Sequence, residues 1–404
     1  MVKPERRTRA DMVAAAAIAV AVAVVAAVIW WTSDARATES RRAASPVPTL
    51  EPAAAVPGAL KQLWSAPDSE ASEPLVVSGA VVTGDGREMQ GRDPVTGRSL
   101  WSYTRDLDLC GVTWVYNYAV AVYPDARGCG QVSSVDARTG TRGPSRTSYA
   151  DRHVTLSGDG TTVLSAGDTR LEMWRSDLVR MLSYGALDAP LNPGKSASPL
   201  CRFVSAAASS AAVSVLEACP GKADLRLTLL RPAKEEDTPD VKYVPQKGLR
   251  DGTGARIVGV SDTTTAVYVP TPKPRVDIVD ETGATIDSTV VTGPPSADAT
   301  MSRAGDLITW WTGEDVMVFS ANNFQYKYTV AASGPNAPVG PATVMAGRLM
   351  VPVTGGYDLF DPNTGAPDRH IPLERPPVRG PVVPAVAGSA VLEKRGDELV
   401  ALGG

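Results

Sequence analysis

The fold of this chain is decided by one stretch, Asp93-Pro94-Val95-Thr96-Gly97-Arg98-Ser99-Leu100-Trp101. It is the fullest copy of a pattern in which a strand ends at an Asp and a Thr-Gly turn leads into the next strand. Further copies lie at Asp136–Gly140 and Asp361–Gly365, and a shortened copy lies at Asp280–Gly283. The Asp can accept hydrogen bonds from the backbone amides that follow it, and the Gly takes the positive φ that closes the turn. The sequence therefore predicts a repeated unit built on an Asp–Gly turn.

The spacing of these turns sets the length of the unit. The Asp residues lie 43, 144 and 81 residues apart, which fits one, three and two units of about forty residues. Degenerate copies fill the gaps: Val318–Asn323 aligns with Leu359–Thr364, while Met173–Arg175 and Leu229–Arg231 occupy the strand-end position. Each unit contains four short extended pieces, which is the pattern of a β-propeller blade. Anchors near residues 93, 136, 175, 231, 280, 320, 361 and 403 predict an all-β, eight-bladed propeller. A seven-bladed ring and a pair of β-sandwiches are the alternatives.

The two ends of the repeat region predict how the ring closes. After Pro381 the chain supplies three strands and then stops, whereas Leu63-Trp64-Ser65 echoes Leu100-Trp101-Ser102. An N-terminal strand that completes the last blade leaves no open sheet edge at the seam. We therefore expect the strand around Trp64 to pair with the strand around Leu399, and Trp101 to cover the joint with the next blade.

The unit strand–Asp–x–x–Thr–Gly–x–x–x–Trp resembles the repeat of the PQQ-like (quinoprotein-type) β-propellers, a family that also includes the BamB outer-membrane assembly factor. The periodicity covers residues 60 to 404, with a clear motif in about half of the blades. The layout also resembles membrane-anchored propeller proteins of high-GC actinobacteria. The resemblance implies a fold and a location, but it does not imply a catalytic activity.

An apolar run of twenty residues, Met12 to Trp31, precedes the repeats. A helix of this length spans roughly 30 Å, the thickness of a bilayer's hydrocarbon core. Trp30 and Trp31 stand where aromatic rings prefer the membrane interface, and the basic residues before the run hold the N-terminus in the cytoplasm. We expect an uncleaved single-pass anchor over residues 12–31 with a cytoplasmic tail over 1–11. A cleaved signal peptide, with Ala35-Arg36-Ala37 as its small-residue site, and a buried core helix are the alternatives.

Charge and composition change after the anchor. The chain through Arg42 carries a net charge of +3, which leaves −7 for the remainder. An acidic domain has no counterion-release drive toward nucleic acid, and we exclude that partner. Residues 32–58 are rich in Ala and Pro, which favours a semi-extended spacer between the membrane and a propeller over residues 59–404.

The four cysteines fall into two similar pairs, Cys110 with Cys129 and Cys201 with Cys219, separated by 19 and 18 residues. In an antiparallel up-and-down blade, both members of a pair reach the same propeller face. An extracytoplasmic location supplies the oxidising compartment. We expect two disulfides with this pairing. Free buried thiols and a zinc site are the alternatives, although no Cys-x-x-Cys and no neighbouring His pair is present.

Signatures of catalysis are missing from the sequence. It contains no adjacent cysteine pair of the kind that packs on the quinone in PQQ enzymes, no Gly-x-Ser-x-Gly and no phosphate-binding loop. Neither His153 nor His370 has a spacing partner, and both are expected in loops or on the surface. We predict no catalytic, cofactor-binding or metal-binding residues and no cofactor.

A few other segments could have a functional role, but each also has a simple structural interpretation. The acidic segment Lys234–Asp240 favours a solvated hairpin tip, and Ser157–Gly160 favours a tight turn. The Trp310-Trp311 pair favours packing, with one ring in the core. The basic stretch Arg138–Arg146 is expected as an exposed loop, either a connector or a contact for an acidic partner.

The sequence therefore favours a membrane-anchored, extracytoplasmic propeller that is a non-enzymatic scaffold or binding module. Its expected partners are the cytoplasmic membrane and an envelope protein or a cell-wall polymer. The BamB resemblance implies help in assembling other envelope proteins. A PQQ-dependent or other envelope enzyme with its site on the propeller axis is the alternative.

Overall fold

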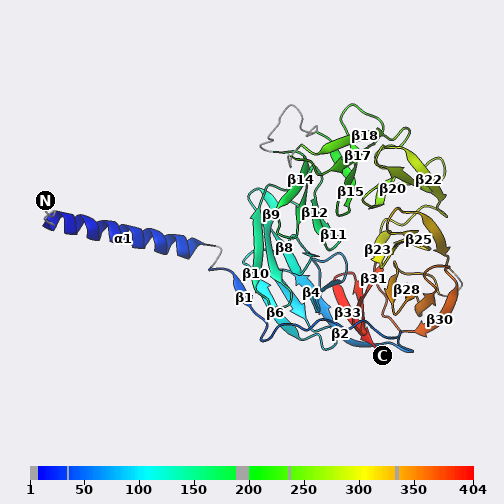
Figure 1. The fold of residues 1–404 in the computed structure, drawn as a ribbon, viewed down its shortest axis with the longest axis horizontal. Coiled ribbons are helices and arrows are strands. Elements are labelled where there is room, and N and C mark those ends of the chain that lie inside the picture. Colours follow the sequence, from blue (N-terminus) through cyan, green and yellow to red (C-terminus); the bar gives the residue numbers. More distant parts are fainter. Residues whose placement is uncertain (1–7, 34–35, 188–199, 235–237, 333–335) are drawn as a thin grey trace.

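The computed structural model describes residues 8–33, 36–187, 200–234, 238–332 and 336–404. Within these residues the strands form eight sheets arranged around a ring, and one helix extends away from it (Figure 1). The chain is an eight-bladed β-propeller, as the repeat predicts; the seven-bladed ring and the paired sandwiches are excluded.

Blades 1 to 4 follow one another along the chain. They consist of β3 (Leu75–Val77), β4 (Ala80–Asp85), β5 (Glu88–Arg92) and β6 (Ser99–Thr104); β7 (Gly111–Val115), β8 (Tyr118–Asp125), β9 (Gly128–Asp136) and β10 (Arg142–Thr147); β11 (Thr155–Gly158), β12 (Thr162–Ala166), β13 (Arg170–Arg175) and β14 (Arg180–Gly185); and β15 (Arg202–Ala208), β16 (Val213–Ala218), β17 (Arg226–Arg231) and β18 (Asp240–Pro245).

Blades 5 to 8 complete the ring. They consist of β19 (Arg256–Val260), β20 (Thr264–Val269), β21 (Arg275–Asp280) and β22 (Thr285–Val290); β23 (Thr300–Ala304), β24 (Leu307–Trp311), β25 (Val316–Ser320) and β26 (Tyr326–Val330); β27 (Thr343–Met345), β28 (Arg348–Val353), β29 (Gly356–Phe360) and β30 (Pro367–Pro372); and β31 (Val382–Ala387), β32 (Ala390–Arg395) and β33 (Glu398–Gly403) with β2 (Lys61–Pro67).

The predicted anchors all fall at the end of the third strand of a blade, including the degenerate ones. Arg175 ends β13, Arg231 ends β17 and Ser320 ends β25. The strand-end position persists where the Asp–Gly motif has been lost, because these third strands are buried along almost their whole length between neighbouring blades.

The last blade closes with β2, the strand around Trp64, as expected. β2 pairs antiparallel with β33, with Trp64 opposite Ala401 and Ala66 opposite Leu399. The chain thereby ties its beginning to its end, and the seam has no unpaired edge between blade 8 and its outermost strand.

The cores lie between successive blades, and an outer-strand side chain covers several of the joints. Trp101 of β6 donates from Nε1 to the Ala137 carbonyl at 2.8 Å, in the Asp136 turn of blade 2. Trp64 of β2 donates likewise to the Pro94 carbonyl at 3.0 Å, in the Asp93 turn of blade 1. Tyr328 of β26 donates to the Pro362 carbonyl at 2.9 Å, in the turn of blade 7. The Asp turn of one blade thus receives the outer-strand aromatic of the blade before it.

The helix α1 (Arg9–Thr32) begins three residues before the predicted anchor. Thr8 is its N-cap, and Thr8 and Asp11 form a reciprocal capping box that starts the helix earlier. None of the helix residues is buried, and its length and composition suffice to cross a membrane. Most of the predicted cytoplasmic tail, residues 1–7, lies outside the described residues.

The expected spacer takes a different form. β1 (Glu39–Arg41) adds a fifth strand to the outer edge of blade 1, pairing with β6. The next residues lie along the propeller, where the amides of Ala43 and Val47 donate to the carbonyls of Thr139 at 3.0 Å and Arg138 at 2.8 Å. Val47 and Val56 are buried. This segment therefore lies along the ring, with two of its apolar side chains buried there. We call residues 43–60 the strap.

Candidate functional site

The strap makes the two faces of the ring different. After blade 2 it passes the first hairpin of blade 1, where the Pro48 carbonyl lies against Gly79, and the first hairpin of blade 8, where Leu50 lies beside Gly388. It reaches blade 7 where Arg369 donates to the Val56 carbonyl at 2.8 Å. This face, the strap face, also carries the turns between the third and fourth strands. The opposite face, the open face, carries the hairpins between the second and third strands and the connections from blade to blade.

The Asp–Gly turns have one geometry in the copies with the motif. Asp93 Oδ1 accepts from the amides of Val95 at 3.0 Å and Thr96 at 2.8 Å and from the Thr96 hydroxyl at 3.0 Å. The carboxylates of Asp136, Asp280 and Asp361 accept corresponding bonds from the amides and the Thr hydroxyl that follow each of them. The closing glycines have positive φ: Gly97 at 68°, Gly140 at 71°, Gly283 at 84° and Gly365 at 70°. These residues shape the joints between blades.

Two disulfides lie on the open face with the predicted pairing. Cys110 and Cys129 join the start of blade 2 to the beginning of β9, and their Cα atoms are 6.0 Å apart. Cys201 and Cys219 join the start of blade 4 to the end of β16, with Cα atoms 4.2 Å apart. Each bridge ties a blade-to-blade connection to its own sheet, which stiffens the loops of this face. All four cysteines are bridged in this structure, so none of them is a free thiol.

The hollows of the ring are shallow and are found on both faces. One of about 520 Å³ opens on the open face between blades 4, 5 and 6 and is lined by Ser205, Arg250, Asp251 and Arg256, among others. Another of about 540 Å³ lies beside the strap and is lined by Leu50, Val76, Val344 and Val386. The lining of the first includes three charged side chains together with apolar ones, whereas that of the second is made mostly of apolar residues.

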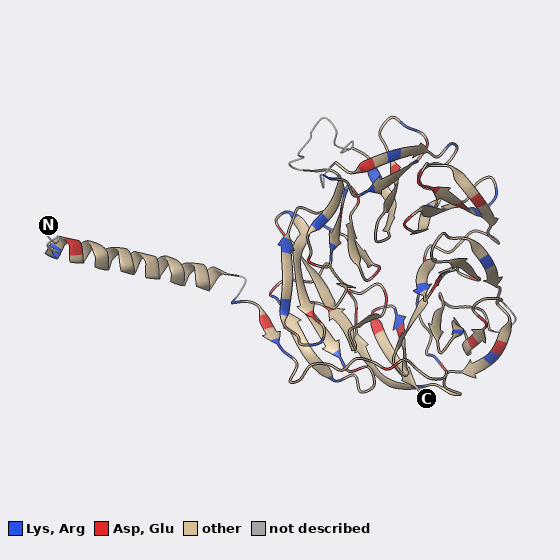
Figure 2. Ribbon diagram, in the orientation of Figure 1, with Lys and Arg blue, Asp and Glu red and all other residues tan. Residues whose placement is uncertain are grey.

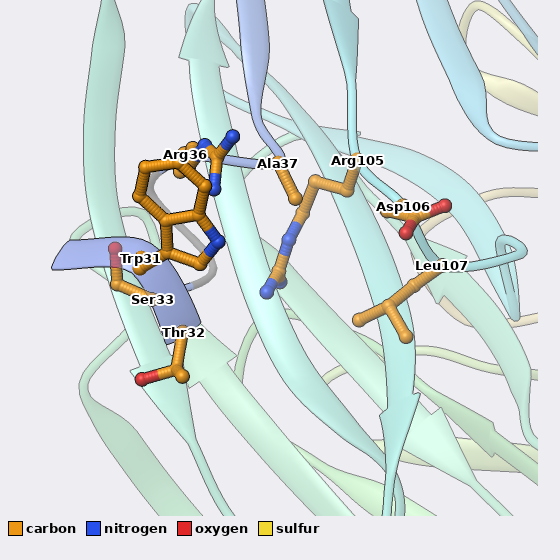
Figure 3. Close-up of a pocket in the computed structure, with 8 residues that line it drawn as sticks. All are labelled: Trp31, Thr32, Ser33, Arg36, Ala37, Arg105, Asp106 and Leu107. Atoms are coloured by element: carbon orange, nitrogen blue, oxygen red, sulfur yellow. The ribbon is translucent and has the colours of Figure 1, made fainter. Parts of the chain in front are cut away.

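A third hollow, of about 360 Å³, lies where the helix meets blade 1 (Figure 3). The Arg36 guanidinium lies 3.8 Å from the centre of the Trp31 ring, and Arg105 points toward the space beside Leu107 (Figure 3). Trp30 and Trp31 are both more than half exposed at this end of the helix. Their assignment to a membrane interface stays a prediction.

The ring-closing seam holds a buried ion pair that the sequence did not reveal. Asp68 is fully buried; its Oδ1 accepts from the Gly84 amide at 2.8 Å, and its Oδ2 lies 3.4 Å from Lys394 Nζ. Burial raises the pKa of Asp68 to about 6, although the nearby Lys394 ammonium acts in the opposite direction. Desolvation also raises the pKa of Glu73 to about 7, although part of its side chain reaches the surface. Asp68 fastens blade 8 to blade 1.

A second buried carboxylate braces blades 7 and 8. Glu393 is fully buried and accepts from Arg375 Nη2 at 2.7 Å and from Arg395 Nε at 2.6 Å. Burial opposes the ionisation of Glu393, yet the hydrogen bonds and charge of Arg375 hold its pKa below its usual value.

Charged residues are spread around the whole ring (Figure 2).

The basic stretch Arg138–Arg146 differs from the expected exposed loop. Residues 142–147 form β10, and Arg146 is mostly buried against blade 3. Its guanidinium donates to Glu172 at 3.0 Å and to the Leu178 carbonyl at 2.7 Å. The outermost strand of a blade packs along the next blade, so a basic residue there becomes part of the joint.

Other predicted segments have structural places. Trp310 and Trp311 are both buried, although only one of the two rings was expected in the core. Trp310 packs toward blade 5 and Trp311 toward blade 7, on opposite faces of β24. Asp159 accepts from the amides of Thr161 and Thr162, each at 2.8 Å, in an ordinary turn. His370 lies on β30 with Nδ1 2.6 Å from Asp358. The centre of the acidic segment, residues 235–237, lies outside the described residues.

Comparisons with known proteins find similar structures but no similar sequence. No family model matches the chain, and neither does any curated protein. Sqt1 of Saccharomyces cerevisiae is similar in structure with a TM-score of 0.50 and 10% identity, over 90% of this chain and 99% of that one. BamB from Moraxella catarrhalis has a TM-score of 0.48 and 14% identity, over 85% and 98%. The dihydro-heme d1 dehydrogenase NirN has a TM-score of 0.49 and 15% identity, over 86% and 76%.

The class that the fold defines is therefore the β-propeller, here with eight blades, two disulfides and a strap across one face. At these identities the likenesses concern the architecture alone.

Proposed function

We propose that this protein is a membrane-tethered binding module whose open face holds an envelope protein outside the cytoplasm. The observation that carries the proposal is the difference between the faces. The strap face is crossed by the chain's own residues 43–60, whereas the open face presents loops that two disulfides brace. Rigid loops lose little conformational entropy when a partner binds, which favours affinity.

The location is part of the proposal. The apolar helix α1 is compatible with a single-pass anchor, and the paired cysteines suit an oxidising compartment. The N-terminus would then be cytoplasmic and the propeller extracytoplasmic. Because β1 joins the edge of blade 1 only a few residues after the helix, the propeller would stay near the membrane surface.

Two exposed tyrosines provide a matched test. Tyr149 follows β10 on the open face and is 44% exposed, while Tyr116 lies in the first hairpin of blade 2 on the strap face and is 71% exposed. Each is replaced by a photo-crosslinking phenylalanine derivative in the full chain, and intact cells are irradiated. We expect one or a few discrete protein adducts from position 149 and far fewer from position 116. Equal adducts from both positions, or none from 149, would overturn the proposal, and a smear of polymer adducts would assign the face to a cell-wall polymer.

A further inference from the structure

A fully buried carboxylate lies beside the second disulfide. Glu217 stands near the end of β16, two residues before Cys219, and its side chain is fully buried. One of its carboxylate oxygens and the sulfurs of Cys201 and Cys219 lie within 4.8 Å of one another. Among the described residues no carboxylate groups in this way with Cys110 and Cys129, so the two bridges have different surroundings.

The hydrogen bonds of Glu217 are one-sided. Its Oε1 accepts from Tyr184 Oη at 3.0 Å, from Arg226 Nε at 3.0 Å and from the Thr228 hydroxyl. Its Oε2 is buried and has no hydrogen-bond partner among the described residues. An unsatisfied buried oxygen costs free energy, so a carboxylate that keeps one beside a disulfide calls for an explanation. The three donors fix the carboxylate as outer partners fix a metal ligand.

We propose that Cys201, Cys219 and Glu217 form a zinc site when the disulfide is reduced. Two thiolates and one carboxylate oxygen are a ligand set that Zn²⁺ accepts, with a fourth position for water. The charges balance, because the two thiolates and the carboxylate together match the divalent ion and the Arg226 guanidinium. In a tetrahedral site with Zn–S distances of about 2.3 Å the sulfurs lie about 3.8 Å apart, a separation that rotation of the freed side chains supplies.

Reduction requires an external dithiol, and the structure indicates its course. Cys219 is half-buried while Cys201 is 3% exposed, so the attacking thiolate of the dithiol reaches the Cys219 sulfur. The Cys201 sulfur leaves as a thiolate beside Arg226, whose Nη2 lies 3.5 Å away. The second thiol of the reagent then displaces Cys219 and the reagent becomes a disulfide. Two electrons have passed to the protein, and the two thiol protons are released when Zn²⁺ binds.

The test uses the full chain in detergent, reduced under anaerobic conditions, with Co²⁺ as a spectroscopic probe and Zn²⁺ as competitor. We expect one Co²⁺ per chain, with thiolate-to-cobalt charge-transfer absorption that Zn²⁺ abolishes and that the oxidised protein lacks. Cys201→Ser with Cys219→Ser removes the absorption, whereas Cys110→Ser with Cys129→Ser keeps it. Glu217→Gln, which preserves the shape of the side chain, weakens binding roughly tenfold or more.

Three results would overturn the site. They are an absence of cobalt absorption in reduced protein, absorption that survives loss of Cys201 and Cys219, and Glu217→Gln binding as tightly as the natural chain. Circular dichroism of each reduced variant accompanies the titration. Loss of the β-sheet signal in the reduced natural chain also counts against the proposal, because the site needs the folded blade. None of these outcomes depends on whether the open face binds an envelope protein.

Discussion

Gly97 shows why the turn of the repeat ends in glycine. Its φ of 68° lies in the left-handed region, and a Cβ atom there would come within 2.6 Å of Trp64 Cγ. The same approach occurs at Gly140 against Trp101 and at Gly365 against Tyr328. Glycine therefore serves two purposes, a turn within one blade and close contact with the outer strand of the blade before it.

Comparing Gly97→Ala with Gly86→Ala separates the effect of the turn conformation from that of the contact between blades. Gly86 also has positive φ, at 56°, but its Cβ would meet nothing within 4 Å. We expect Gly97→Ala to lower the free energy of unfolding by about 3 kcal/mol, from backbone strain plus overpacking, and Gly86→Ala by about 1 kcal/mol. Urea unfolding of both variants measures the difference. Equal losses would show that the contact with Trp64 contributes nothing.

Asp68 makes a pH-dependent contribution at the seam. Burial raises its pKa from 3.8 to about 6, so between these values the folded state holds a proton that the unfolded chain releases. The contribution of Asp68 to stability is therefore fullest at low pH and declines as the pH rises toward 6.

We expect Asp68→Asn to remove this decline. The free energy of unfolding of the natural chain, minus that of the variant, should fall between about pH 4 and pH 6 and level off above that range. Urea unfolding at several pH values measures this difference. Lys394→Met is a second variant for the same measurement, because it removes the ammonium that lowers the pKa of Asp68. A difference that does not change with pH would contradict the raised pKa.

At the scale of elements, the strap is held by backbone bonds that a free spacer would lack. Its amides at Ala43 and Val47 bond to the Asp136 turn of blade 2, and Val47 is 4% exposed. We expect hydrogen exchange of these two amides to be slow, at rates close to those of the neighbouring strands. Val47→Asp should speed exchange within residues 43–58 and leave the blades protected. Fast exchange of the strap in the natural chain would restore the spacer interpretation.

The sequence predicted the elements whose signals are local. Asp93 and Gly97 carry their turn within five residues, and the cysteine pairs lie within single blades, so spacing alone was informative. The strap was missed because Ala and Pro reveal nothing about Thr139 or Arg138, which lie about ninety residues away. Arg146 was misplaced for the same reason, since its partner Glu172 belongs to the next blade. Glu217 gave no sequence signal beyond its position near Cys219.

At the scale of the whole molecule, the chain forms a ring that β2, a strand from its N-terminal part, closes by completing blade 8. β2 and β33 are separated by more than three hundred residues and pair over their full lengths. Such closure constrains all blades together, because opening the seam exposes the edges of blade 8 and the joint with blade 1 at once.

The most direct test is a disulfide engineered across the seam. Pro67 and Glu398 are exposed and lie opposite one another in the pairing of β2 with β33, and the natural cysteines are all bridged. In the double variant Pro67→Cys with Glu398→Cys, we expect an intramolecular crosslink that speeds migration in a denaturing, non-reducing gel and disappears with reductant. Pro67→Cys with Asp287→Cys, on β22 of blade 5, should not form one. If the cysteines at positions 67 and 398 formed no crosslink, or crosslinked only between molecules, the closed ring would be contradicted.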